Sequence, residues 1–353
     1  MIVDSHLDLA MNAVYLNRDL RMSAHELRDA ERAAGRTGNG LGVATTGLPD
    51  MRRGGVGLSF VTVLARVNPA GKSFLDFATP EIAHAQGQGQ LAWYLEMERQ
   101  GDCRLIRSAE DLEAHLAAWE ANPVSCQLGF VLSMEGADPI VGPGSLGQWV
   151  EQGLRIVSLA HYGPSRYAHG TKSEGGLFPM GRELLAEMGR LGVALDVTHL
   201  SDGSFVEVLD VFDGPVLATH SNCRALVPGH RQLSDDMIRE LVAREAVIGS
   251  ALDAWMLQPG WVIGETTPDG VSMETYVDHI DHVCQLAGDA RHAAIGTDLD
   301  GGYGTEQTPR DLDTIADLRL VPELLGKRGY SDSDIELIMH GNWERWLRGV
   351  LPR

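Results

Sequence analysis

Short runs of apolar residues recur along the chain, and most of them are continuous rather than alternating with polar residues. Strands that are buried on both faces have this pattern, as in parallel sheets covered by helices. The pattern predicts eight strands, over residues 2–9, 56–65, 127–134, 155–161, 193–199, 215–220, 246–252 and 292–298.

Between these strands lie segments whose apolar residues recur at helical spacing. They predict helices over residues 80–100, 108–122, 182–191, 234–244, 273–286 and 331–349. Three of these segments begin at a serine followed by acidic residues, which is a helix-capping pattern.

Strands and helices that alternate in this way predict an α/β fold, a (β/α)8 TIM barrel. The connection over residues 66–125 is too long for one crossover, so we expect a helical insertion after the second strand. Stretches rich in proline and glycine predict long loops at the C-terminal face, over residues 141–147, 163–179 and 258–270. No shift in composition marks a linker, and we expect a single domain over residues 1–353.

The composition limits the partners that we expect. A formal net charge of -20 argues against a nucleic-acid partner, which would need a basic face. No apolar run approaches the length of a membrane span, so no membrane partner is expected. The four cysteines lie far apart without a Cys-x-x-Cys pair, which suits a reducing compartment, and we expect a cytoplasmic protein. A homodimer is compatible with these features.

Six of the eight predicted strands end on or beside a histidine, aspartate or glutamate. In a barrel the C-terminal strand ends surround the active site. A single histidine after an apolar run is usually hydrogen-bonded locally, but a shared position at the strand ends indicates a metal centre. The side chains concerned are those of His6, Asp8, Glu135, His161, His199, His220 and Asp298.

The number of these groups indicates two metal ions. His6 and Asp8 can hold one divalent ion and His199 and His220 a second, with Glu135 as a bridging carboxylate. A water shared by two such ions ionises near neutral pH, and the resulting hydroxide attacks a carbonyl carbon or a phosphoryl phosphorus. Sites of this kind accept zinc, cobalt, manganese or iron.

Three further residues can act on a substrate. Asp298 is surplus to the ligand count and can accept the proton of the hydroxide and pass it to the leaving group. His161 can bond the substrate carbonyl oxygen. Arg231 can clamp a substrate carboxylate, with Arg166 and Arg224 as alternatives.

Several motifs follow one another along the chain. They are Asp4-Ser-His-Leu-Asp8, Leu48-Pro-Asp-Met-Arg-Arg-Gly-Gly-Val-Gly57, Met134-Glu-Gly-Ala137, Leu159-Ala-His161, Asp196-Val-Thr-His199, Pro215-Val-Leu-Ala-Thr-His-Ser221, Arg231-Gln-Leu-Ser-Asp-Asp236, Ile295-Gly-Thr-Asp-Leu-Asp-Gly301 and Gly341-Asn-Trp343. In this order and spacing, they resemble the membrane (renal) dipeptidase family, zinc peptidase family M19, among the amidohydrolase-like barrels.

The resemblance implies two Zn2+ ions and hydrolysis of small dipeptide substrates, with tolerance of a D-residue at the C-terminal position. It places one zinc on His6 and Asp8, the other on His199 and His220, and Glu135 between them. It also implies that His161 and Arg231 bind substrate and that Asp298 handles the proton of the water.

Two segments depart from the family's usual pattern. One is the loop after His161, and the other is the seventh strand, which continues Ser250-Ala-Leu-Asp253-Ala-Trp255. Both lie near the expected position of the substrate side chains and leave specificity open. A carboxylate-bearing amide, lactam or ester is an alternative substrate, and a non-catalytic metal-binding protein is a further alternative.

Overall fold

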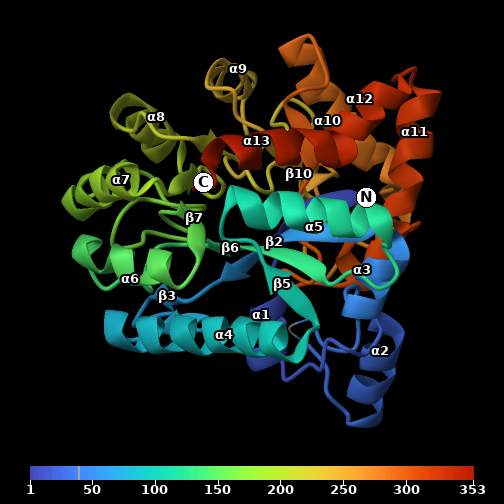
Figure 1. Ribbon diagram of the computed structural model, residues 1–353, viewed down its shortest axis with the longest axis horizontal. Coiled ribbons are helices and arrows are strands. Elements are labelled where there is room, and N and C mark those ends of the chain that lie inside the picture. Colours follow the sequence, from blue (N-terminus) through green and yellow to red (C-terminus); the bar gives the residue numbers. More distant parts are fainter. Residues whose placement is uncertain (39) are drawn as a thin grey trace.

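The computed structural model describes residues 1–38 and 40–353, and its central feature is a ring of eight parallel strands. Figure 1 labels β2, β6, β7 and β10 of this ring at the centre of the molecule. The strands follow one another in the order β1 (Ile2–Leu7), β2 (Val56–Val63), β6 (Leu128–Met134), β7 (Leu154–Ser158), β8 (Ala194–Asp196), β9 (Val216–Leu217), β10 (Ile248–Ser250) and β11 (Ala293–Ile295). Each lies within or next to one of the eight predicted segments. The predicted barrel is confirmed.

Two sets of hydrogen bonds close the ring. Between β9 and β10, the Gly249 N–H donates to the carbonyl oxygen of Ala218 at 2.8 Å. Between β11 and β1, the Asp298 N–H donates to the His6 carbonyl oxygen at 3.3 Å. The Thr297 hydroxyl also donates to Asp4 Oδ2 at 2.6 Å. These hydrogen bonds connect the last strand, β11, to the first strand, β1, and so close the barrel.

Helices surround the ring on its outer face (Figure 1). They are α1 (Leu9–Val14), α2 (Ala24–Ala33), α3 (Leu48–Gly54), α4 (Pro80–Gln100), α5 (Ala109–Ala121), α6 (Leu146–Glu151), α7 (Pro179–Leu191), α8 (Asp202–Val211), α9 (Asp235–Ala243), α10 (Met273–Ala287), α11 (Val321–Lys327), α12 (Asp332–Glu336) and α13 (Asn342–Val350). The expected serine caps are present, since Ser108, Ser234 and Ser331 each accept a hydrogen bond from the backbone N–H three residues later. The short helices α1, α3, α6 and α11 were not predicted, because six or seven residues carry little periodicity. The ten-residue helices α2 and α8 were not predicted either.

The long connection after β2 holds α4 and α5, as the expected insertion requires. It also contains strands that the sequence did not predict. β5 (Cys103–Leu105) pairs in parallel with β6, and β3 (Arg66–Val67) pairs with β4 (Asp76–Phe77). Runs of two or three residues are too short to be distinguished from a loop by their pattern.

The C-terminal segment is not the single α-helix that was predicted over residues 331–349. A π-helical turn, Leu337–Gly341, separates α12 from α13. Beyond this turn the Asn342 side chain donates to the carbonyl oxygens of Ala290 and Ala293 at 2.6 and 2.9 Å. An extra residue in one turn changes which side chains face the barrel, and here it brings Asn342 onto the beginning of β11.

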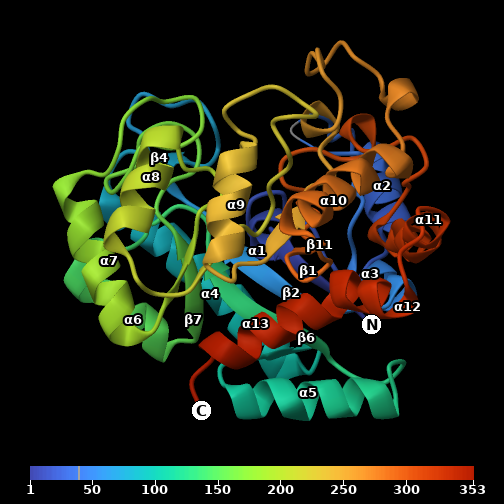
Figure 2. The ribbon, with the colours of Figure 1, turned by 90° about the horizontal axis from the view of Figure 1, so that it is seen from above.

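Side chains of α13 fill the barrel interior at the N-terminal ends of the strands. Trp343 and Trp346 pack against apolar side chains that come from most strands of the ring, among them Val3, Phe60 and Val131. The indole of Trp343 donates to the carbonyl oxygen of Ile295 at 3.0 Å. Figure 2 shows α13 and α5 along one side of the molecule, with the long loops extending from the opposite side. The N-terminal end of the barrel is thus closed, and the C-terminal end remains for a site.

Among the described residues, no helix combines the length and the apolar character that a membrane span needs.

Candidate metal centre

The predicted site residues converge at the C-terminal mouth, but most of them lie beyond the strands rather than on them. His161, His199, His220 and Asp298 each come three residues after the last residue of β7, β8, β9 and β11. Glu135 directly follows β6, and His6 and Asp8 flank the last residue of β1. The strands predicted from apolar runs were therefore too long at this end, because these residues turn inward over the barrel axis.

Two of these turns require a left-handed backbone. His199 has a φ of 69° and Asp298 a φ of 60°, which is uncommon for residues other than glycine. Such conformations persist only where the surroundings fix them, and they cluster at functional sites. Gly301 supports the second turn, because a Cβ at this position would lie 2.1 Å from Asp298 Oδ1.

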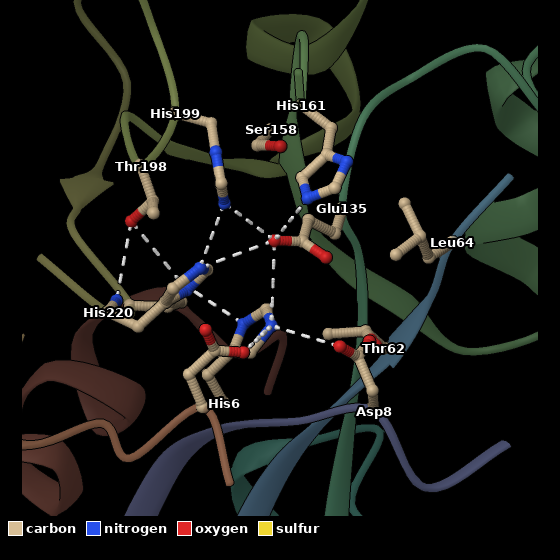
Figure 3. Close-up of polar contacts among 12 residues, drawn as sticks. His6, Asp8, Thr62, Leu64, Glu135, Ser158, His161, Thr198, His199 and His220 are labelled. Carbon is tan, nitrogen blue, oxygen red and sulfur yellow. Dashed lines mark hydrogen bonds and ion pairs between the residues drawn. The ribbon is translucent and has the colours of Figure 1, made fainter. Parts of the chain in front are cut away.

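The Glu135 carboxylate lies at the centre of the cluster (Figure 3). Its Oε1 is 3.1 Å from His199 Nε2 and 3.3 Å from His220 Nε2, and these two nitrogens are 3.1 Å apart. Ligand atoms on a tetrahedral zinc ion at 2.0–2.1 Å are separated by about 3.3 Å. The three atoms therefore have the spacing of one face of a metal coordination shell.

A second set of donors shares the same glutamate. His6 Nε2 is 3.7 Å from Glu135 Oε1 and 3.9 Å from Asp8 Oδ2. It is also 3.7 Å from Asp298 Oδ1. His6 Nε2 is buried and has no hydrogen-bond partner among the described residues. An unpaired lone pair at this position, beside three carboxylates, fits a bound cation.

Hydroxyl groups behind the histidines orient their rings. Thr219 Oγ1 lies 2.6 Å from Asp196 Oδ2 and 2.9 Å from His220 Nδ1. A threonine that donates to the aspartate accepts from His220 Nδ1–H, which leaves the lone pair of Nε2 facing the cluster. Thr171 Oγ1 donates to the His199 carbonyl oxygen at 3.3 Å and lies 2.9 Å from His199 Nδ1, from which it can accept in the same way. The Thr62 hydroxyl donates to Asp8 Oδ1.

The charges of the cluster also call for a cation. Burial raises the pKa of Asp8 to about 6. Burial, with Asp8 and Asp298 nearby, holds the pKa of Glu135 well above its usual value. Burial likewise lowers the pKa of His6 to about 3, with Arg231 adding to the effect. Carboxylates packed together in this way stay ionised at neutral pH only if positive charge is added, and neutral imidazoles are the form that binds metal.

The cluster forms the floor of a cavity with a volume of about 220 Å³. Arg231, His161 and Asp298 line it together with the metal-facing groups. The Arg231 guanidinium is buried and donates to the His220 carbonyl oxygen at 2.9 Å, and within residues 1–38 and 40–353 no carboxylate lies within 4.0 Å of it. His161 Nε2 is 3.8 Å from Glu135 Oε1.

Arg166 and Arg224, the alternatives to Arg231 for binding a substrate carboxylate, lie away from the cavity. Arg224 forms an exposed ion pair with Asp202 at 2.7 Å, and Arg166 donates to the carbonyl oxygen of Val141 at 2.7 Å. Neither residue lines the cavity. Asp300 accepts hydrogen bonds from Thr45 at 2.7 and 2.8 Å and has a structural role.

The orienting threonines are the main part of the site that the sequence did not reveal. Thr219 directly precedes a predicted ligand, but Thr62 and Thr171 lie in other segments. Threonine is common in strands and loops, so its type carries no signal without coordinates. The position of a threonine next to a candidate histidine was the one available indication.

Comparison with known proteins decides the family. The sequence matches the model of the membrane dipeptidase family, peptidase family M19, over residues 1–351. The chain belongs to this family. Dipeptidase tcpJ of Claviceps purpurea is 32% identical over 205 residues, which are 56% of this chain and 45% of that protein. The chain spans about half the length of the curated relatives that it matches, such as this dipeptidase and an uncharacterized dipeptidase of Schizosaccharomyces pombe.

Solved structures of the family share the fold. Dipeptidase AC, a metallo peptidase, superimposes with a TM-score of 0.80 at 22% identity and covers 100% of this chain and 99% of its own. A metallo peptidase from Rhodobacter sphaeroides, solved with a phosphinate mimic of the dipeptide L-Ala-D-Ala, gives a TM-score of 0.79 at 22% identity and covers 99% of both chains. At these identities the likeness concerns the fold alone.

Proposed function

We propose that this chain is a dinuclear metal-dependent dipeptidase, and that its native ions are zinc. The observation that carries the proposal is the position of Glu135 Oε1, which lies 3.1 to 3.7 Å from the Nε2 atoms of His199, His220 and His6. One carboxylate shared by two sets of donors is the arrangement of a bridged pair of ions. Membership of the membrane dipeptidase family supports the same function.

Each ion would have its own ligands from this chain. His6 and Asp8 would hold one ion, His199 and His220 the other, and Glu135 would bridge them, in keeping with the candidate metal-binding groups. When bound, such ions lower the pKa of a water and polarise the carbonyl that it attacks. Imidazole and carboxylate ligands suit zinc, although cobalt, manganese and iron also accept them.

Asp298 would transfer a proton from the attacking water to the leaving amine. Its carboxylate lines the cavity next to His6, and burial together with Asp8 and Asp253 holds its pKa well above the usual value. A carboxylate with a raised pKa can take a proton from the attacking water and give it to the leaving amine. His161, which faces the same cavity, would donate to the carbonyl oxygen of the scissile bond.

Arg231 would bind the C-terminal carboxylate of the dipeptide. Its guanidinium is buried at the cavity wall without an ion-pair partner among the described residues, and a planar guanidinium matches a carboxylate with two parallel hydrogen bonds. The proposal includes dipeptides with a D-residue at this end, since the Rhodobacter relative was solved with a mimic of L-Ala-D-Ala. L-Ala-L-Ala and L-Ala-D-Ala are therefore both first substrates to assay.

Replacement of Arg231 by alanine tests this orientation. We expect the Michaelis constant for L-Ala-L-Ala to rise by about 100-fold, because a charge-assisted, desolvated pair is lost. The constant for the C-terminal amide of the same dipeptide should change by less than about threefold. Steady-state kinetics with both substrates give the comparison. Arg224→Ala, at an exposed ion pair away from the cavity, is the matched control. Equal effects on the dipeptide and its amide would remove Arg231 from the carboxylate site.

A further inference from the structure

One buried carboxylate in the cavity, Asp253, has no assigned contact with the metal ions or the substrate, although its charge adds to the raised pKa of Asp298. Asp253 comes three residues after the end of β10, the same relation that His161, His199, His220 and Asp298 have to their strands. It lines the cavity and its side chain is 6% exposed. The metal ligands, the proton carrier and the carboxylate clamp are already assigned, so Asp253 is left over.

The contacts of Asp253 leave one of its oxygens unused. Oδ1 accepts from Gln307 Nε2 at 2.8 Å and from the Trp255 N–H at 3.4 Å. Oδ2 accepts no hydrogen bond from the described residues, and none of their lysines, arginines or histidines lies within 4.0 Å of it. A nearly buried carboxylate is unfavourable when ionised unless a cation pairs with it. Burial raises the pKa of Asp253 to about 7, although its hydrogen bonds and the charge of Arg231 oppose this shift.

Asp253 and Arg231 belong to one wall of the cavity. β9 and β10 are neighbours in the barrel, and their following loops are joined by side chains. The Gln232 side chain donates to the Met256 carbonyl oxygen at 2.8 Å, and Asn222 exchanges two hydrogen bonds with Ala251, at 2.9 and 3.0 Å. The position of Asp253 relative to the carboxylate clamp is therefore fixed.

The opposite wall is apolar. It contains Met11, Leu64 and Leu75, which follow β1 and β2 and pack together as a separate buried cluster. In the ring, β2 lies across the mouth from β9 and β10. If Arg231 binds the C-terminal carboxylate of a dipeptide, the C-terminal side chain would lie near Asp253 and the N-terminal residue would lie towards the apolar wall.

We propose that Asp253 selects dipeptides whose C-terminal residue carries a positively charged side chain, such as lysine or arginine. The inference rests on the proposed dipeptidase function and specifies its substrate class. The unused Oδ2 would accept from the ammonium or guanidinium group. Trp255, two residues further along the same wall, can pack against the apolar stem of the side chain.

The test compares substrates that differ in one charge. For the metal-loaded wild-type protein, we expect kcat/KM for L-Ala-L-Lys to exceed that for L-Ala-L-norleucine by about 10-fold or more, as a desolvated ionic hydrogen bond provides. Asp253→Asn should lower kcat/KM for L-Ala-L-Lys by roughly 10- to 100-fold and that for L-Ala-L-Ala by less than about threefold. The asparagine carbonyl can still accept from Gln307. Asp236→Asn, on an exposed aspartate of α9, is the matched control.

The possible results distinguish the preference for a positively charged side chain from the dipeptidase activity itself. An equal loss for L-Ala-L-Lys and L-Ala-L-Ala would overturn the inference, since Asp253 would then act on the α-ammonium of every dipeptide or on the fold. Hydrolysis of L-Ala-L-Ala by the wild type without preference for lysine would overturn the inference but not the dipeptidase function. No hydrolysis of any dipeptide would overturn the function itself.

A measurement on the wild type does not depend on the variant folding. The free amino acids L-lysine and L-norleucine are the leaving products of these substrates and compete for the same wall. We expect the inhibition constant of lysine to be about 10-fold lower than that of norleucine. Equal inhibition constants would overturn the selection of a positive charge.

Discussion

Replacement of Glu135 by glutamine should leave the protein unable to hold two metal ions and should reduce kcat by at least about 100-fold. Residues that only orient a metal ligand already change metal affinity by about 10- to 100-fold, and in the proposed centre Glu135 would contact both ions directly. The amide keeps the shape of the side chain but removes the negative charge next to His199 and His220, at 3.1 and 3.3 Å.

Metal content after dialysis, measured on the same sample as kcat, checks this expectation. Glu151→Gln makes the same chemical change at an exposed position of α6 and should retain full metal content and activity. If the Glu135 variant kept two ions per chain and a kcat within about threefold of the wild type, Glu135 would not be the bridge.

Replacement of Asp298 by asparagine should separate catalysis from metal binding. We expect two ions to remain bound while kcat falls by about 10²- to 10⁴-fold, the usual contribution of a positioned acid or base. Asparagine has the same shape and tolerates the left-handed backbone that this position requires, with a φ of 60°. The fold should therefore be retained, and the loss should lie in proton transfer.

Single-turnover kinetics with L-Ala-L-Ala, together with metal analysis, measures this effect. Asp236→Asn again provides the control, because its carboxylate is exposed and lies outside the cavity. Near-normal turnover with full metal content would show that another group carries the proton.

The barrel and the convergence of the candidate ligands could be predicted because each rests on a repeated pattern. Eight apolar runs gave eight strands, and the residues that follow them converge because parallel strands of a barrel end at one face. His199 and His220 illustrate this well: they are 21 residues apart in sequence, yet their Nε2 atoms lie 3.1 Å apart.

Features that depend on a few residues could not be predicted. The ladder of β9 includes only Val216 and Leu217, although the apolar run is longer, because the chain turns inward towards His220. The π-helical turn directly precedes Asn342, whose side chain contacts the beginning of β11, and this long-range contact is not visible in the local sequence. Thr171 reaches His199 from a long irregular loop, and only the folded chain shows the contact.

The residues that could determine substrate specificity were predicted only in part. The sequence marked Asp253 and Trp255 as departures from the family's pattern but gave them no role. The cavity places both residues on the wall that carries Arg231. Their position, rather than their type alone, suggests which end of the substrate they would contact.

Metal titration of the stripped protein tests the central proposal most directly. Chelated protein would be dialysed, supplied with zero to three equivalents of Zn2+, and assayed for hydrolysis of L-Ala-L-Ala. A bridged pair of ions predicts no activity in the stripped protein and a rise that reaches its plateau at two equivalents. A plateau at one equivalent, or full activity without metal, would contradict the dinuclear centre on which the proposed function depends.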